Sequence, residues 1–297
     1  MNDAVATKPR YDRTTDDLGN IVEFGHVNVT VDDQGKAISF YLAGLGLTRD
    51  PFMMPGVENI WVNAGRNAFH LPTRRPQVLR GTIGLVIPNL EKLLTRLGNV
   101  RKHLDTTQFS FREAGDTVEA TCPWGNRFRC HAPDPGRFGS MRLGMPYVDF
   151  DVAPGTDLAG IERFYRDIFD AITGMGSDDR GPFAWVRVAD GSHLCFHEGS
   201  APLAPFDGHH IQVTLANFSR PYEKLLARGL ITEETNRHQY RFVDIVDPDT
   251  NKPLFQVEHE VRSMLHPMFT RSLINRNPDL SLPTFVPGYE YSSWALG

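Results

Sequence analysis

The sequence is poor in cysteine and lacks long apolar runs. Its 297 residues include three cysteines, Cys122, Cys130 and Cys195, without CxxC spacing. An odd number of thiols, each within or beside an apolar run, argues against a disulfide framework. No run approaches the ~18 apolar residues of a membrane span, and residues 1–17 carry no apolar core of signal-peptide length. We therefore expect no membrane association and a cytoplasmic location.

Clustered basic residues are also missing. The net charge is -5, the pI is about 6.1, and lysine and arginine are scattered rather than interleaved with aromatic residues. This pattern argues against nucleic-acid binding and favours a small-molecule substrate, neutral or anionic, as the partner. The sequence is compatible with a homo-oligomer and does not fix the number of subunits. The hydrophobic content of 40% is enough for one large domain or two of ordinary size.

What the sequence does contain is a repeated order of elements. Strand, helix and then three strands are predicted from about residue 21, and the same order begins again near residues 80, 147 and 210. In the first copy, residues 23–31 alternate as a strand and residues 32–42 have helical spacing. Four copies of roughly 50 residues predict two pseudo-twofold halves.

The boundaries follow from this repeat. Residues 1–20 are polar and aperiodic and should form a mobile lead-in. Residues 21–135 and 145–261 are the two predicted halves, with two modules each. Residues 262–297 break the period and predict a C-terminal strap, packed on the outside or on a partner subunit; alternatively, it is a lid that supplies Arg271 or Arg276 to an anion.

Histidines recur at both ends of the repeating unit. The last apolar run of three copies ends near His70, His131 or His197, and the fourth copy has Gln256 there. His26 and His210 begin the first strands of the first and fourth copies. This pattern predicts a metal centre built by a repeated fold. Because neutral imidazole is the ligating form, metal binding should weaken below the ordinary histidine pKa of about 6.5.

Three motifs carry a resemblance to a known family. They are Gly25-His26-Val-Asn-Val-Thr-Val31, Ser39-Phe-Tyr-Leu-Ala-Gly-Leu-Gly-Leu47 and the closing turn Asp247-Pro-Asp-Thr-Asn251. With the module order, they resemble the vicinal oxygen chelate superfamily of glyoxalases, bleomycin-resistance proteins and extradiol dioxygenases, over roughly residues 21 to 260. The resemblance implies an α+β fold in which four βαβββ modules pair into two cupped mixed-sheet halves.

The resemblance also implies where ligands come from, namely the first and last strands of each module. Two competing sets result, one per half: His26, His70, Thr82 and His131, or Tyr147, His197, His210 and Gln256. Glu258, two residues beyond Gln256, could replace it on the same face. Such a histidine-rich set favours iron, manganese, zinc or nickel. In the C-terminal half, His238 resembles a second-sphere acid/base histidine, and His238 or Tyr240 would move the proton.

The function implied is a metal-dependent enzyme acting on a small substrate with adjacent oxygens. The number of modules favours ring cleavage of the extradiol dioxygenase type, with glyoxalase-like isomerase or lyase chemistry as the alternative. A noncatalytic small-molecule binder of the bleomycin-resistance type is the third hypothesis. In that case aromatic residues would line the cup, namely Trp61, Phe69, Phe183, Trp185 and Phe255.

Overall fold

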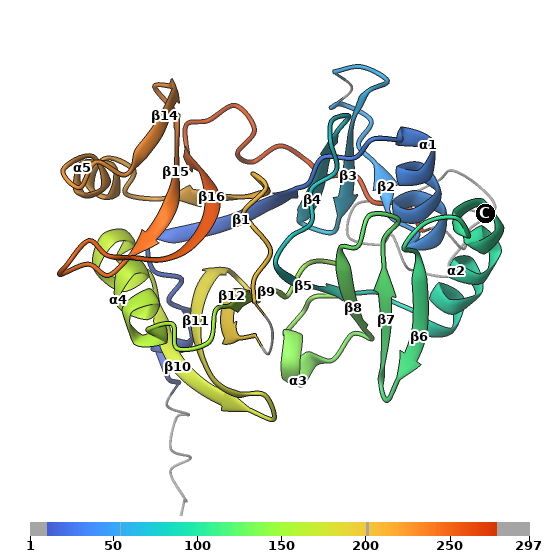
Figure 1. Ribbon diagram of the computed structural model, residues 1–297, viewed down its shortest axis with the longest axis horizontal. Coiled ribbons are helices and arrows are strands. Elements are labelled where there is room, and N and C mark those ends of the chain that lie inside the picture. The colour runs from blue at the N-terminus through green and yellow to red at the C-terminus, as the bar shows by residue number, and fades with distance from the viewer. Residues whose placement is uncertain (1–10, 54, 200–201, 278–297) are drawn as a thin grey trace, which may run out of the picture.

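The strands form two mixed sheets of eight strands each (Figure 1). The computed structural model describes residues 11–53, 55–199 and 202–277. In spatial order, the first sheet contains β14 (Ile231–Asn236), β15 (Gln239–Val246), β16 (Pro253–Ser263), β13 (His210–Leu215), β1 (Ile21–Asn28), β4 (Asn67–Pro72), β3 (Asn59–Ala64) and β2 (Thr48–Arg49). The second contains β10 (Thr173–Asp178), β11 (Gly181–Ala189), β12 (Ser192–Glu198), β9 (Tyr147–Val152), β5 (Gly81–Val86), β8 (Arg127–His131), β7 (Thr117–Thr121) and β6 (Ser110–Ala114).

Each module has one main helical segment after its first strand, so the predicted α+β module order is confirmed. A short 3-10 helix, η1 (Arg13–Asp16), precedes β1, and α3 (Pro135–Phe138) connects the second and third modules. Within the described ranges, no helix combines the length and apolar character needed to cross a bilayer. The module helices are α1 (Gln34–Ala37) with its π-helical continuation η2 (Ile38–Gly44), then α2 (Leu90–Leu104), α4 (Leu158–Phe169) and α5 (Ser219–Leu226).

The two sheets do not coincide with the two predicted halves of the sequence. The first sheet joins the first and fourth modules through antiparallel pairing of β1 with β13, and the second joins the middle modules through β5 and β9. The local signals that define a module are the same whichever module it pairs with, so they could not distinguish this arrangement from pairing of consecutive modules. Residues far apart in the sequence thus share one sheet.

Helices and aromatic side chains fill the space between the sheets. Helix η2 packs against α2 at one end of the molecule, and α4 packs against α5 at the other (Figure 1). Phe69 of the first sheet meets Phe128 of the second, with ring centroids 5.9 Å apart. At the other end, Tyr165 of α4 donates or accepts a 2.7 Å hydrogen bond with His259 of β16. The shared core therefore lies on the helix side of both sheets.

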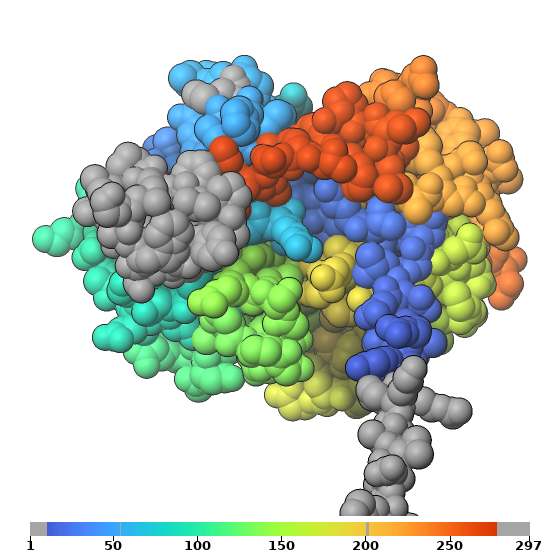
Figure 2. Space-filling view, turned by 180° about the vertical axis from the view of Figure 1, so that it is seen from behind, coloured from blue at the N-terminus to red at the C-terminus, as the bar shows by residue number. Residues whose placement is uncertain are grey.

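The opposite face of the first sheet is crossed by the chain after β16. We call residues 264–277 the strap, and Figure 2 shows this segment running from the fourth module to the first. Asn63 donates to the carbonyl oxygen of Ile274 at 2.9 Å, and Asn275 bonds both backbone groups of Gly65. These contacts fix the strap on the first module. The rest of the predicted strap, residues 278–297, and residues 1–10 of the lead-in lie outside the described residues.

Candidate metal centre

Three histidines from adjacent strands meet on the strap side of the first sheet. His26 lies on β1, His70 on β4 and His210 on β13. One ring nitrogen from each lies within 4.8 Å of the others. We call these residues the histidine trio. Its members come from the first and fourth modules, so the structure combines part of each predicted ligand set.

A bulge in β1 aims the first of these histidines. Phe24 pairs with Val213 and His26 with Gln212, which leaves Gly25 as an extra residue. A Cβ atom on Gly25 would lie 1.8 Å from Oε1 of Gln212, so glycine leaves the room that this side-chain amide occupies. Because the extra residue shifts the alternation by one, Glu23 and His26 face the same side of the sheet.

Burial keeps the imidazoles of His26 and His70 in the neutral form that binds metals. His26 is 1% exposed, and burial holds its pKa well below 6.5. Burial also lowers the pKa of His70 to about 3. Nε2 of His26 and Nε2 of His210 are both buried without a hydrogen-bond partner. Unpartnered buried nitrogens are costly unless something occupies them, and a metal ion fits this need.

The other ring nitrogens have partners that could orient the rings. Asn59 Oδ1 lies 2.8 Å from Nε2 of His70, and Glu258 Oε2 lies 3.2 Å from Nδ1 of His210. An acceptor on one ring nitrogen fixes the proton there and leaves the other nitrogen as a lone-pair donor. The structure thus places Glu258 behind His210 rather than within the trio.

The strand register identifies a carboxylate beside the trio. On β4, His70 lies two residues beyond Ala68, the partner of His26. On β16, Glu260 lies two residues beyond Glu258, the partner of His210. Glu260 therefore occupies the position equivalent to His70 in the fourth module. Its carboxylate is 3.5 Å from Nε2 of His210.

The charge of Glu260 is held by its neighbours. Although burial opposes ionisation, contacts with His210, His26 and Arg262 keep the pKa of Glu260 well below 4.5. Arg241 and Arg262 each approach a carboxylate oxygen of Glu260 to 2.5 Å. Gln256, the residue predicted from the motif, is exposed and donates instead to Asp244 at 2.9 Å. The structure does not bring Gln256 to the trio.

The remaining predicted ligands lie in the second sheet. Nε2 of His131 is 2.8 Å from the Tyr147 hydroxyl. The ring of His197 lies between Asp149, 2.7 Å from Nδ1, and Asp178, 3.2 Å from Nε2. Thr82 of β5 pairs with Asp149 of β9. Among the described residues, these side chains form no cluster comparable to the trio.

Ion pairs occupy the corresponding face of the second sheet. Arg180 pairs with Asp149 and Arg127 pairs with Asp151, while Nη2 of Arg180 also lies 2.8 Å from Nδ1 of His197. Both ring nitrogens of His197 therefore already contact charged side chains of the protein, which leaves neither nitrogen open to a metal ion. The two sheets have therefore diverged in chemistry, although they share one architecture.

The two residues predicted to move protons lie away from the trio. His238 is in the turn before β15, with Nδ1 3.5 Å from Oγ of Ser263. Tyr240 is 1% exposed and packs against Phe218 and Tyr222, and burial raises the pKa of its hydroxyl. Its neighbour Arg241 faces Glu260, so Tyr240 points to the helix side of the sheet.

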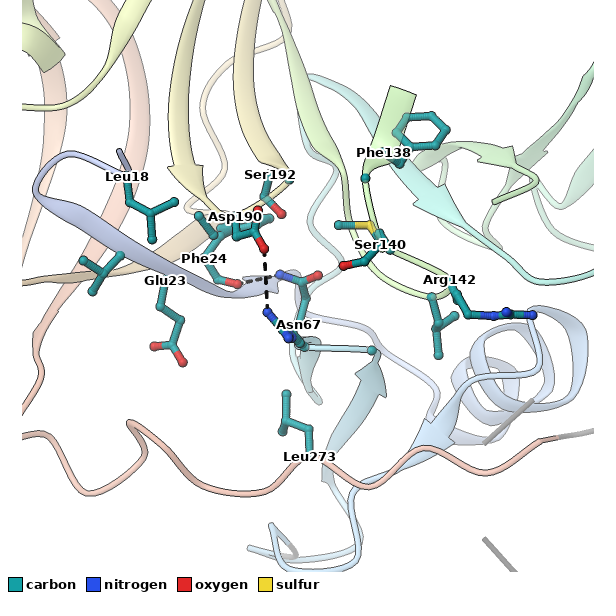
Figure 3. Close-up of a pocket in the computed structure, with 18 of the residues that line it drawn as sticks. Leu18, Glu23, Phe24, Asn67, Phe138, Ser140, Arg142, Asp190, Ser192 and Leu273 are labelled. Carbon is teal, nitrogen blue, oxygen red and sulfur yellow. Dashed lines mark hydrogen bonds and ion pairs between the residues drawn. The ribbon is translucent and has the colours of Figure 1, made fainter. Parts of the chain in front are cut away.

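Two cavities with shared lining residues lie on this side of the first sheet, and His26 of the trio lines the inner one. The inner chamber has a volume of about 30 Å³, roughly the space of one water molecule. The outer cleft, about 770 Å³, lies between β1, the β3–β4 turn, the connection after α3, the β11–β12 turn and the strap (Figure 3). Glu23, Arg66, Arg271 and Leu273 line both. The inner chamber is lined by Glu23, Gly25, His26, Trp61, Arg66, Gln212, Arg262, Met268, Arg271 and Leu273.

Sequence reasoning missed Glu23 and Glu260 as site residues. A regular strand would turn Glu23 away from His26, and the glycine between them was the available signal of a bulge. Glu260 belongs to a strand that continues to Ser263, beyond the apolar run from which its end was predicted. Arg271, predicted as an alternative to be an anion-binding residue of a lid, does line the chamber, and it also pairs with Asp50.

Comparison with known proteins gives matches in structure. No protein-family model and no curated protein matches the sequence. Glyoxalase I from Zea mays is 16% identical, with 81% of this chain and 92% of that chain covered and a TM-score of 0.56. A proposed dioxygenase from Bacillus subtilis subsp. subtilis str. 168 is 12% identical, with 82% and 86% covered and a TM-score of 0.54. A catechol 2,3-dioxygenase, 14% identical with 82% and 93% covered, has a TM-score of 0.29, too low to support an argument.

Proposed function

The chain has the fold of the vicinal oxygen chelate superfamily, as its motifs predicted, and we propose that it is a metal-dependent enzyme acting on a small substrate with two neighbouring oxygens. The observation that carries this proposal is the convergence of the trio, with unpartnered buried nitrogens on His26 and His210. Glu260 would complete the ligand set. A nitrogen-rich set with one carboxylate favours zinc, nickel, iron or manganese over magnesium or calcium.

We favour proton-transfer chemistry of the glyoxalase type, an isomerase or lyase reaction. When bound, the ion would stabilise negative charge that develops on a substrate oxygen. The chain itself supplies part of the enclosure, because Trp61, Met268 and Leu273 add apolar surface to a chamber whose other lining residues are mostly charged or polar. Exclusion of water strengthens each electrostatic interaction with the substrate. Arg262 and Arg271 line the same space and would attract an electron-rich oxygen.

Ring cleavage is the second candidate. His26, His210 and Glu260 are two histidines and one carboxylate, the set that oxygen-activating iron sites use with three positions open. With His70 as a fourth ligand, fewer positions remain for a diol and oxygen, and for this reason we place ring cleavage second. Noncatalytic binding of an apolar ligand is the third candidate, favoured by the aromatic ring of Trp61 at the chamber wall.

The deciding experiment is metal analysis of the protein as purified without chelator and after adding metal back. We expect about one ion per chain in the wild type and its loss in His26→Ala and His210→Ala, since fewer ligands remain. His131→Ala and His197→Ala are matched controls that should retain it. Zinc or nickel directs assays to isomerisation, and iron or manganese directs them to diols in the presence of oxygen. A wild type that takes up no metal would overturn the enzymatic proposal and leave the binding protein.

A further inference from the structure

We propose that Glu23 is the proton-transfer group of this site. Its carboxylate would remove a proton from the carbon that carries one of the two substrate oxygens and return it to the neighbouring carbon. This inference rests on the proposed metal-dependent function. It assigns the acid/base role to a residue of β1 in place of His238 or Tyr240.

The position of Glu23 is the first support. The bulge at Gly25 places Glu23 on the same face of β1 as His26. Glu23 projects from β1 toward the strap (Figure 3) and lines both the inner chamber and the outer cleft. Of the described residues that line the chamber, it alone carries a carboxylate. A substrate that extends from the cleft to His26 would therefore pass the carboxylate of Glu23.

A hydrogen bond to Glu23 fixes the orientation of its side chain and favours its ionised form. The amide nitrogen of Gln212 donates to the hydroxyl of Thr214 at 3.0 Å, and this hydroxyl lies 2.5 Å from Oε2 of Glu23. Because the amide NH₂ can only donate, the hydroxyl proton of Thr214 is available for Glu23, which accepts it as a carboxylate. No hydrogen bond joins Oε1 of Glu23 to a described residue, so this oxygen is available to a substrate.

The electrostatic surroundings suit a base that both takes and returns a proton. Burial raises the pKa of Glu23 above 4.5, against the opposing charges of Arg262 and Arg271. Arg66 and His26 are the other charged or titratable side chains at the chamber. General acid/base groups work best when their pKa approaches the working pH, and a shift upward moves a carboxyl in that direction.

The reaction balances without an oxidant. The C–H bond of a hydroxy-carbonyl compound breaks, its proton moves to Oε1 of Glu23, and its electron pair forms a carbon–carbon double bond. The carbonyl electron pair moves onto oxygen, which gives an enediolate. Transfer of the hydroxyl proton to the former carbonyl oxygen, together with protonation of the other carbon by Glu23, completes the exchange of carbonyl and hydroxyl positions. The same half-reaction, run in heavy water, replaces the carbon-bound hydrogen by deuterium.

The test uses the metal-loaded full chain and hydroxyacetone as the probe, with deuterium incorporation followed by proton NMR. Removing a general base should lower the exchange rate by roughly 100-fold or more in Glu23→Gln. Glu23→Asp should retain part of the rate, because it keeps the carboxylate at a shorter reach. Asp116→Asn is the matched control, since Asp116 is exposed in the turn between β6 and β7 and lines neither the cleft nor the chamber, and its rate should equal that of the wild type.

A second readout does not depend on turnover. Acetohydroxamic acid loses a proton when it chelates an ion, and in the wild type Glu23 should accept that proton. Calorimetry in buffers of different ionisation enthalpy should therefore find about one more proton released to solvent per ligand in Glu23→Gln. Metal content and thermal stability of this variant should match the wild type.

The outcomes separate the two proposals. A wild type that binds no metal overturns both the proposed function and the role of Glu23. A metal-loaded wild type that exchanges hydroxyacetone no faster than buffer, or a Glu23→Gln variant that exchanges as fast as the wild type, overturns the role of Glu23 alone. Loss of exchange with metal and hydroxamate binding retained supports it.

Discussion

The indole of Trp61 lies stacked on the imidazole of His70, with ring centroids 4.2 Å apart and planes inclined by 15°. The two residues face each other directly across the antiparallel pair β3 and β4. The indole is buried, and the guanidinium of Arg271 lies 5.7 Å from its ring centre. An ion that binds His70 would therefore change the surroundings of a fluorescent side chain.

This contact predicts an optical signal for metal binding. Titration of the apoprotein with nickel should quench tryptophan fluorescence, because the stacked ring lies next to the paramagnetic ion. Trp61→Phe should bind nickel, measured by equilibrium dialysis, but lose most of the quenching. Trp185→Phe is the control, since Trp185 lies on β11 of the second sheet. Equal quenching in Trp61→Phe and the wild type would contradict the placement of the ion.

Closure of the chamber depends on a buried ion pair of the strap. Asp50 is fully buried, accepts from the amides of Phe52 and Met53 at 2.8 and 2.9 Å, and pairs with Arg271. Asp50→Asn removes the charge from this pair and should lower the free energy of unfolding by about 1.5–3 kcal/mol. Limited proteolysis should cut the strap faster in this variant. Asp116→Asn, which removes an exposed partner of Arg137, should leave both measurements unchanged.

The junction of the second and third modules requires a glycine. A Cβ atom on Gly81 would lie 2.1 Å from the backbone oxygen of Asp149 on the neighbouring strand. Backbone cannot move aside as a side-chain end can, so Gly81→Ala should destabilise the protein by about 1–3 kcal/mol in urea unfolding. Gly98→Ala, in helix α2 with open space around the added methyl, should instead stabilise it by up to about 1 kcal/mol. A neutral result for Gly81→Ala would mean that β5 and β9 can separate.

Acid should weaken the fold through a buried histidine. Burial lowers the pKa of His259 to about 3, whereas an unfolded histidine titrates near 6.5. Between these values the unfolded chain binds the extra proton, so stability is complete above pH 6.5 and falls as the pH drops toward 3. At pH 5.5 this residue alone should cost about 1.3 kcal/mol relative to pH 7.

The variant His259→Phe isolates this effect. It should be less stable at pH 7, because the Tyr165 hydroxyl loses its 2.7 Å partner, yet its stability should fall less steeply between pH 6.5 and 5. His103→Gln, on the exposed side of α2, serves as the comparison and should keep the slope of the wild type. Identical slopes for His259→Phe and the wild type in urea titrations would contradict the assignment.

The sequence predicted the modules well because their signals are local. Alternation in residues 23–31 and the turn at Asp247–Asn251 depend only on neighbouring residues, and the four modules appear in the predicted order. Which module pairs with which is not encoded by such local signals. Whether β1 lies beside β5 or β13 depends on contacts between distant segments, and each first strand offers a similar apolar edge. The pairing of the first with the fourth module was therefore not predictable from pattern alone.

The candidate site shows the same division. His26, His70 and His210 were each singled out from their places in the repeat, but they were assigned to two competing sets because consecutive modules were expected to pair. Glu260 escaped notice because the last strand of the fourth module was predicted to end at Glu258, whereas β16 continues to Ser263. The strand continues because His259 and Val261 pack against the helix side while Glu260 faces the other side.

The pairing of the first module with the last also sets an order of events during synthesis. Glu23 and its partner Thr214 are 191 positions apart, so β1 must wait for the synthesis of this long intervening segment. At ordinary rates of translation this delay is roughly 10–40 s. The second sheet joins consecutive modules and can assemble during that time. Until β13 emerges, β1 exposes an unpaired edge to other nascent chains, and the histidine trio can form only after His210 has been made.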